Sequence, residues 1–98
     1  MSSIPGSSEA VCVEISYDLS SDQAYRLRRC FEGLVAQGRD VVIDCSKVER
    51  MDSSGVGALV FLFKRLRANH LSLRIVGLRG HPMAFAKLLR IDKAIHFA

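Results

Sequence analysis

The chain has 98 residues, of which 49% are hydrophobic, and its 14 basic and 10 acidic side chains give a formal net charge of +4. This length suits one domain with one modest core, and the hydrophobic content excludes a chain that is disordered throughout. No basic stretch followed by an apolar core marks a signal peptide, and no apolar run approaches the roughly 20 residues that span a bilayer. We therefore expect a cytoplasmic protein without membrane insertion.

The first elements follow a serine-rich start. Residues 1–9 ("MSSIPGSSE") combine serines with a glycine and a proline, which predicts a flexible tail, so the domain is expected at residues 10–98. Ala10–Ser16 ("AVCVEIS") alternates apolar and polar residues in its second half and predicts a strand. A helix is expected over Asp22–Gln37, with Gly38 as its C-terminal stop. Its inner face would consist of Ala24, Leu27, Phe31, Leu34 and Val35.

The middle of the chain predicts a second strand, a second helix and a third strand. Val41–Cys45 ("VVIDC") is a short β-branched run typical of a buried strand. Ser53–Asn69 predicts a helix, and Leu71–Gly77 ("LSLRIVG") predicts the next strand. The core face of this helix is expected to be Val56, Leu59, Val60, Phe63 and Leu66.

The end of the chain adds a third helix and a short strand. Gly80-His81-Pro82 would introduce the helix, since proline suits a first helical turn. Ala94–Phe97 is expected to form the last strand. The order β-α-β-α-β-α-β predicts an α/β fold, with a small mixed sheet and helices packed on it. The inner face of the third helix would be Phe85, Leu88 and Leu89.

Three cysteines, Cys12, Cys30 and Cys45, are far apart in the sequence and form no CxxC pair. This spacing argues against a zinc site or a disulfide scaffold, and neither the cysteines nor the three separated histidines suggest any metal site. Cys12 and Cys45 lie in apolar, strand-like runs and are expected to be buried thiols.

The most informative segment is "DSSG" at residues 52–55, directly before an apolar helix. Asp52 or Ser53 is a plausible N-cap, because its side-chain oxygen would accept a backbone N–H of the first turn. Capping explains one polar residue, but it explains neither the second serine nor the glycines at 55 and 57. The helix face away from the core would be Ser54, Gly57, Ala58, Phe61 and Arg65. Its small residues would let another protein approach closely, unless Phe61 packs under a neighbouring loop.

These residues carry a family resemblance. "VVIDCSKVERMDSSGVGAL" resembles the central motif of STAS domains, in particular the anti-sigma factor antagonists: a strand ending in an acid (Asp44), a short loop, D-S-S-G and an amphipathic helix. The later segments "LRIVGL" and "AFAKLLRIDKAIHF" resemble the family's next strand, third helix and last strand. The resemblance therefore implies the STAS fold for most of residues 10–97.

The resemblance also implies a function. The first serine of the pair, Ser53, would be phosphorylated by a partner anti-sigma factor, a serine kinase of the histidine-kinase-like ATPase type, and dephosphorylated by a PP2C-type phosphatase. The unmodified protein would bind the anti-sigma factor, and the phosphorylated protein would be released. No cofactor is expected here, since ATP and magnesium belong to the kinase. The partner-binding residues would be Asp52, Ser53, Ser54, Gly55, Gly57, Ala58, Phe61 and Arg65.

The competing interpretations find less support in the sequence. Catalysis by Ser53 or Ser54 would need a base, an acid and a G-x-S-x-G turn, which is absent, so no enzyme is expected. Direct nucleic-acid binding would use the arginines, but no recognition motif accompanies them. The alternative function is a non-switching STAS scaffold in a phospholipid-transport or sensory complex.

Overall fold

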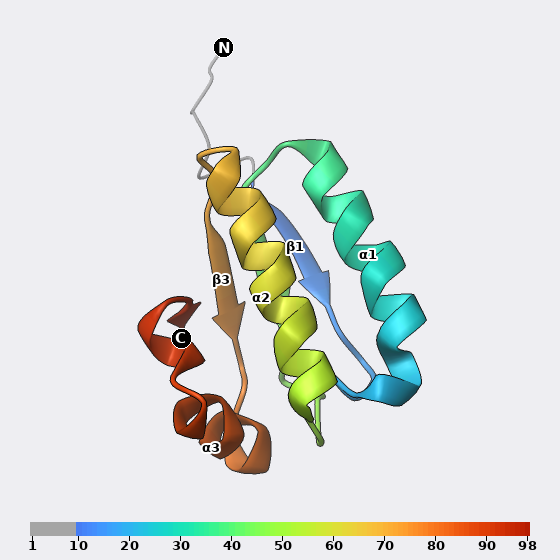
Figure 1. Ribbon diagram of the computed structural model, residues 1–98, viewed down its shortest axis with the longest axis vertical. Helices are drawn as coiled ribbons and strands as arrows, with labels where there is room; N and C mark the ends of the chain where they lie inside the picture. Colours follow the sequence, from blue (N-terminus) through green and yellow to red (C-terminus); the bar gives the residue numbers. More distant parts are fainter. Residues whose placement is uncertain (1–9) are drawn as a thin grey trace.

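A four-stranded sheet supports two long helices in the computed structural model, which describes residues 10–98 (Figure 1). The predicted tail, residues 1–9, lies outside the described residues. In chain order the elements are β1 (Val11–Glu14), the 3-10 turn η2 (Ser21–Gln23), α1 (Ala24–Gln37), β2 (Val41–Asp44), α2 (Ser53–Ala68), β3 (Leu73–Val76), α3 (Gly80–Leu88), the 3-10 turn η3 (Ile91–Lys93) and β4 (His96–Phe97).

The strands lie in the order β1-β2-β3-β4, which is also their order in the chain. Val41 of β2 pairs with Val11 of β1 on one side and with Leu73 of β3 on the other, and every pairing within residues 10–98 is parallel. The predicted fold class and element order are confirmed. The antiparallel pair that a mixed sheet requires is not found in this part of the chain, because a helix or helical turn returns the chain to the same end before each new strand.

The helices α1 and α2 lie side by side on one face of the sheet (Figure 1). Gly38 ends α1 in the left-handed conformation (φ +66°), as predicted. Ala24, expected on the inner face of α1, is instead exposed, because it is the first residue of the helix. The sheet presents alternate strand residues to the helices. The residues buried between these layers include Leu27, Phe31, Leu34, Val41, Ile43, Leu59, Leu62, Leu66, Leu73 and Ile75.

The buried face of α2 is wider than the predicted one. Leu62 is fully buried, whereas Val60 and Phe63 are only partly buried. The predicted positions Val56, Leu59 and Leu66 are buried. The difference arises because α2 packs against both the sheet and α1, so its apolar surface is wider than one stripe.

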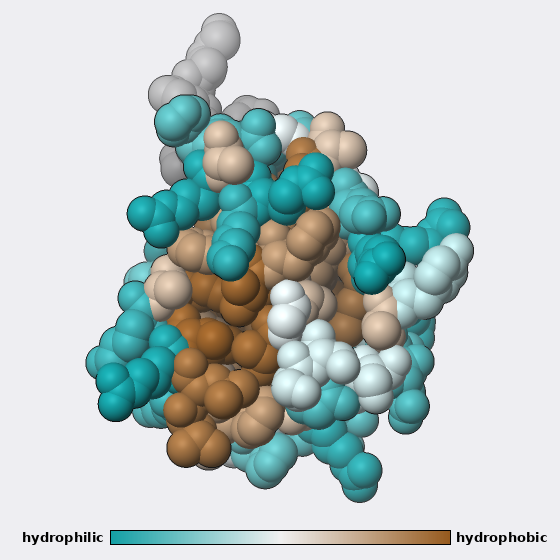
Figure 2. All heavy atoms as spheres, in the orientation of Figure 1, coloured by the Kyte–Doolittle hydropathy of each residue, from teal (hydrophilic) through white to brown (hydrophobic). Residues whose placement is uncertain are grey.

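The prediction for α3 is largely wrong. Leu88 and Leu89 are 75% and 45% exposed, and Phe85 is only partly buried, while Pro82 and Ala86 are buried in their place. The helix is short, with Leu88 as its last residue and Leu89 as its C-cap, and both of these side chains are exposed. Figure 2 shows hydrophobic residues gathered on the side of the molecule where α3 lies.

The cysteines divide between surface and interior. Cys45 is buried, as predicted, and burial raises the pKa of its thiol to about 12. Cys12 is exposed, which corrects the prediction. It alternates along β1 with Val11 and Val13, which pack against the core, so the side chain of Cys12 points to the opposite face of the sheet.

Candidate functional site

The segment before α2 is held by a neighbouring loop. Leu19 forms a parallel bridge with Met51: its N–H donates to the carbonyl of Arg50 at 3.0 Å, and its carbonyl accepts the N–H of Asp52 at 3.0 Å. The carboxylate of Asp18 also accepts the N–H of Arg50, at 3.1 Å. These bonds fix the path of the chain up to the residue before Ser53.

Asp52 joins the two helical starts. Its Oδ1 accepts the backbone N–H of Gly55 at 3.1 Å, which confirms it as the N-cap of α2, and its Oδ2 accepts the backbone N–H of Ser21 at 3.0 Å. The N–H groups of Ser21 and Gly55 lower the pKa of Asp52, because they stabilise the charged carboxylate. One side chain therefore caps α2 and anchors the turn that leads into α1.

The position of Gly55 in the fold requires a glycine. It is buried, and a β-carbon at this position would collide with the backbone carbonyl of Leu19. The glycine is thus required because the first turn of α2 lies directly against the neighbouring loop. Gly55 is therefore needed for the fold itself, whether or not it also contributes to a partner surface.

Ser53 and Ser54 are the first two residues of α2, and both are exposed. Ser53 directly follows the anchored Asp52, so its position is defined while its side chain faces solvent. The first N–H groups of a helix have no partner within the helix, and together with the helix dipole they favour a negative charge at this end.

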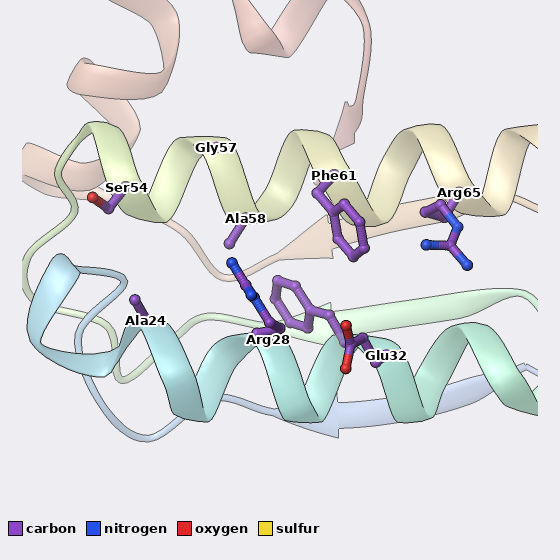
Figure 3. A pocket seen from close by; sticks show the side chains of 9 residues that line it. Ala24, Arg28, Glu32, Ser54, Gly57, Ala58, Phe61 and Arg65 are labelled. Carbon is purple, nitrogen blue, oxygen red and sulfur yellow. The ribbon is translucent and has the colours of Figure 1, made fainter.

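A groove with a volume of about 510 Å³ runs between α1 and α2 (Figure 3). Phe61 is 36% exposed at its edge, with the guanidinium of Arg65 5.4 Å from the ring centroid, so Phe61 is not covered by a loop. The groove contains the predicted Ser54, Gly57, Ala58, Phe61 and Arg65, and with them Ala24, Arg28, Phe31 and Glu32 of α1.

The α1 side of this groove was not predicted from the sequence. Arg28 and Glu32 line the groove but are not among the predicted partner-binding residues. The available signal was topological: helices of successive parallel crossovers pack next to each other on one face of the sheet. From that rule, the polar edge of α1 could have been predicted to lie beside the small residues of α2.

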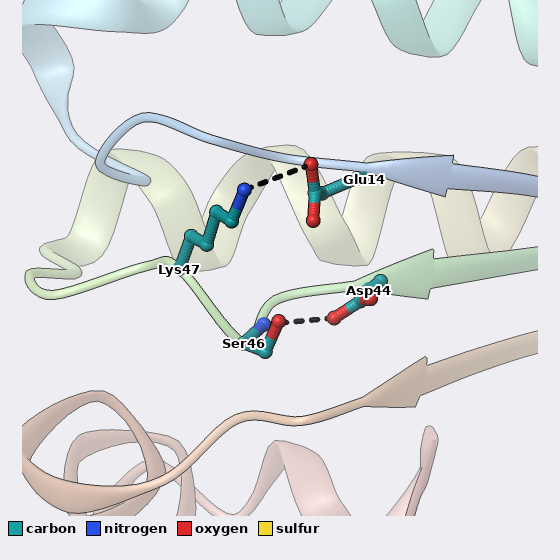
Figure 4. A network of polar contacts seen from close by, with 4 residues as sticks. All are labelled: Glu14, Asp44, Ser46 and Lys47. Atoms are coloured by element: carbon teal, nitrogen blue, oxygen red, sulfur yellow. Dashed lines mark hydrogen bonds and ion pairs between the residues drawn. The ribbon is translucent and has the colours of Figure 1, made fainter.

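A second polar network closes the turn after β2 (Figure 4). The backbone N–H of Ser46 donates to Asp44 Oδ1 at 2.9 Å, and Lys47 Nζ lies 3.6 Å from Glu14 Oε1. The N–H and the hydroxyl of Ser46 lower the pKa of Asp44, with a smaller contribution from Lys47. Gly77 (φ +79°) packs against this turn, where a β-carbon would lie 2.9 Å from the Ser46 nitrogen. The acid at the end of β2 therefore has a structural role.

Residues 10–98 contain neither a candidate metal site nor a helix that could cross a membrane. No group of three or more His, Cys, Asp or Glu side chains there is arranged to hold a metal ion. None of the helices in this part of the chain has the length and apolar character needed to cross a membrane.

Comparison with known proteins places the chain in a family. A sequence model for the STAS domain of the MlaB type matches residues 2–96. The chain therefore belongs to the STAS domain family. No curated protein sequence matches it significantly.

The solved structures that share the fold include the following two. A candidate anti-sigma factor antagonist from Thermotoga maritima superposes with a TM-score of 0.81 and 16% identity, covering 90% of this chain and 77% of that chain. The anti-sigma factor antagonist SpoIIAA in its unphosphorylated form gives a TM-score of 0.71 and 17% identity, covering 92% of this chain and 79% of that chain. The predicted STAS fold is confirmed.

Proposed function

We propose that this protein is a cytoplasmic anti-sigma factor antagonist that is switched by phosphorylation of Ser53. In the unmodified state it binds an anti-sigma factor, which is also the serine kinase, and thereby frees the sigma factor. Phosphorylation releases the kinase, and a PP2C-type phosphatase restores binding. The protein itself has no catalytic role and needs no cofactor; the kinase brings ATP and magnesium.

The observation that carries the proposal is the placement of Ser53. It is exposed at the first turn of α2, directly after a doubly bonded Asp52 and next to Ser54, which lines the groove. A phosphate adds about −1.5 to −2 charge, which the helix N-terminus tolerates. A partner surface that fits a small neutral serine would meet this charge beside the Asp52 carboxylate. Phosphorylation would therefore block docking without unfolding the domain.

The test uses the full chain, a purified anti-sigma kinase from the same organism, ATP and magnesium. Mass spectrometry should find phosphate on Ser53, and Ser53→Ala should abolish incorporation while Ser54→Ala retains it. Ser53→Asp should keep the thermal transition of the wild type but bind the kinase at least about tenfold more weakly. Ala84→Asp, on the exposed surface of α3, adds the same charge elsewhere and should leave binding unchanged. Phosphate incorporation that survives Ser53→Ala, or tight binding by Ser53→Asp, would refute the proposal.

A second candidate function is a permanent STAS subunit of a phospholipid-transport or sensory complex. The exposed Leu88 and Leu89 support it, since a constitutive interface favours apolar surface that a switchable one does not need. The matching family model is also described by its MlaB type. In this case, Leu88→Glu would disrupt the complex and Ser53→Asp would not.

A further inference from the structure

The positive charge of the protein is concentrated on α1 and α2. Helix α1 has three arginines against one glutamate, and α2 has three basic residues and no acid. All six basic side chains are exposed. They are Arg26, Arg28, Arg29, Lys64, Arg65 and Arg67.

Four of the aspartates, in contrast, accept hydrogen bonds from backbone N–H groups. Asp18 accepts the N–H of Arg50, Asp40 that of Ser72 and Asp44 that of Ser46, while Asp52 accepts two. Four of the acids are thus occupied within the domain and lie in loops or at strand ends. Because these four aspartates lie outside α1 and α2, they do not locally neutralise the positive charge on the surface of the two helices.

Two arginines border the groove with their hydrogen-bond donors available. Arg28 extends from α1 across the groove toward Ala58 (Figure 3), and within residues 10–98 it has no hydrogen-bond, ion-pair or ring partner. The guanidinium of Arg65 lies 5.4 Å from the centroid of the Phe61 ring, and among residues 10–98 its N–H groups have no hydrogen-bond partner. Both guanidinium groups can therefore bind carboxylates bidentately.

The rest of the groove suits a helix. Gly57 has open space where a side chain would be, and Ala24 and Ala58 add little bulk, so a second backbone can come close. Phe61 offers a partly exposed apolar surface. Since Ala58 and Arg65 are seven residues apart on α2, the positions served by Arg28 and Arg65 are separated by about 10 Å along the groove.

We propose that this groove binds an acidic amphipathic helix of the partner protein, with two carboxylates about seven residues apart facing Arg28 and Arg65 and an apolar side chain between them on Phe61. Glu32 is the one acid that lines the groove, and it excludes a third carboxylate from the middle of that helix. The inference rests on the proposed function, because it assumes that the groove is part of the partner surface, and it adds the chemistry of the partner segment.

The test measures binding of two labelled 16-residue synthetic helices to the full chain by fluorescence anisotropy, with amide NMR shifts to locate the site. Both peptides carry the same leucines; one has glutamates at i and i+7, and the other has lysines there. The acidic peptide should bind at least about tenfold more tightly, since attraction at two sites replaces repulsion. Its shifts should centre on Gly57, Ala58 and Phe61. Raising salt from about 0.05 M to about 0.5 M should remove most of the difference.

Substitutions in the groove that should weaken or strengthen binding of the acidic peptide provide a second test. Arg28→Gln with Arg65→Gln should abolish the preference for the acidic peptide, whereas Glu32→Gln should strengthen its binding about twofold. Arg74→Gln removes an exposed charge from β3, outside the groove lining, and serves as the matched control. Equal binding of the two peptides, an equal loss with Arg74→Gln, or shifts centred on α3 would each overturn the inference.

The two proposals fail separately. If Ser53 is phosphorylated and the phosphate releases the kinase, but the peptides bind equally, only the inference about the acidic helix is refuted. If the acidic peptide is preferred and Ser53 is never modified, the groove chemistry stands and the phosphorylation switch is refuted.

Discussion

The backbone carbonyl of Leu19 lies directly against the α-carbon of Gly55, so the turn before α1 and the first turn of α2 are in contact through main-chain atoms. This contact fixes where the helix start, with its two serines, sits relative to the rest of the domain. The absence of a side chain at residue 55 is therefore a requirement of the fold.

Gly55→Ala should destabilise the domain. An added methyl would push α2 away from Leu19, at a cost of about 1–3 kcal/mol that exceeds the small gain in helix propensity. Urea denaturation measures the change. Gly33→Ala is the matched control, because Gly33 lies in the middle of α1 with open space around it, and it should stabilise the protein by about 0.5–1 kcal/mol. A Gly55→Ala variant as stable as the wild type would contradict the contact.

Asp52→Asn should lower stability at neutral pH by about 1 kcal/mol, because the amide offers one acceptor oxygen where the carboxylate offers two. The pKa of Asp52 is lowered in the folded state, so its stabilising effect is complete above the unfolded value of about 3.9 and is lost as the pH falls through the folded pKa. The difference between variant and wild type should therefore shrink between about pH 5 and about pH 3. Asp22→Asn, an exposed acid on η2, should show a much smaller difference at pH 7. A pH-independent gap would show that the charge does not matter.

Gly57→Leu should separate binding from folding. The side chain enters open space beside the groove, and replacing a helical glycine should leave the free energy of unfolding unchanged or raise it by about 0.5–1 kcal/mol. The same leucine would obstruct an approaching helix, so affinity for the anti-sigma kinase should fall at least about tenfold. Calorimetric titration against the kinase checks this, with Gly33→Leu as the control on α1. Full binding by Gly57→Leu would exclude the groove from the interface.

Leu88→Glu should be nearly neutral for stability, within about 0.5 kcal/mol, because the side chain is mostly exposed. Ala86→Glu on the same helix should unfold the protein or cost several kcal/mol, since Ala86 is fully buried and a carboxylate there would be unpaired. Thermal melts of the two variants compare them directly. A large loss of stability in Leu88→Glu would show that Leu88 packs in the core, as the sequence predicted.

The features that could be predicted from the sequence are those that depend on residues close together in the chain. The Asp52 cap, the start of α2 at Ser53 and the stop at Gly38 follow from signals within three or four positions, and the structure confirms them. The features that could not be predicted depend on residues distant in the chain. The contact of Gly55 with Leu19 is one example, and the placement of Arg28 opposite Ala58 is another.

The exposed Leu88 and Leu89 show a second limit of prediction from sequence, which concerns the buried face of a helix. The spacing of Phe85, Leu88 and Leu89 suits a helical face, but periodicity does not say where a helix ends relative to the layer that it covers. Here α3 ends at Leu88, and Arg90 then takes a left-handed conformation (φ +62°) that turns the chain toward β4. Leu88 and Leu89 therefore lie at the end of the helix with their side chains exposed.

The hydrogen bonds of Asp52 to Ser21 and Gly55 affect how a kinase could recognise Ser53. Ser53 is already wound into a helical turn, and the bonds from Asp52 to Ser21 and Gly55 hold it there. A kinase that modifies Ser53 must therefore accept a curved, preformed epitope assembled from two distant loops, and a linear peptide cut from residues 46–60 should be a poor substrate.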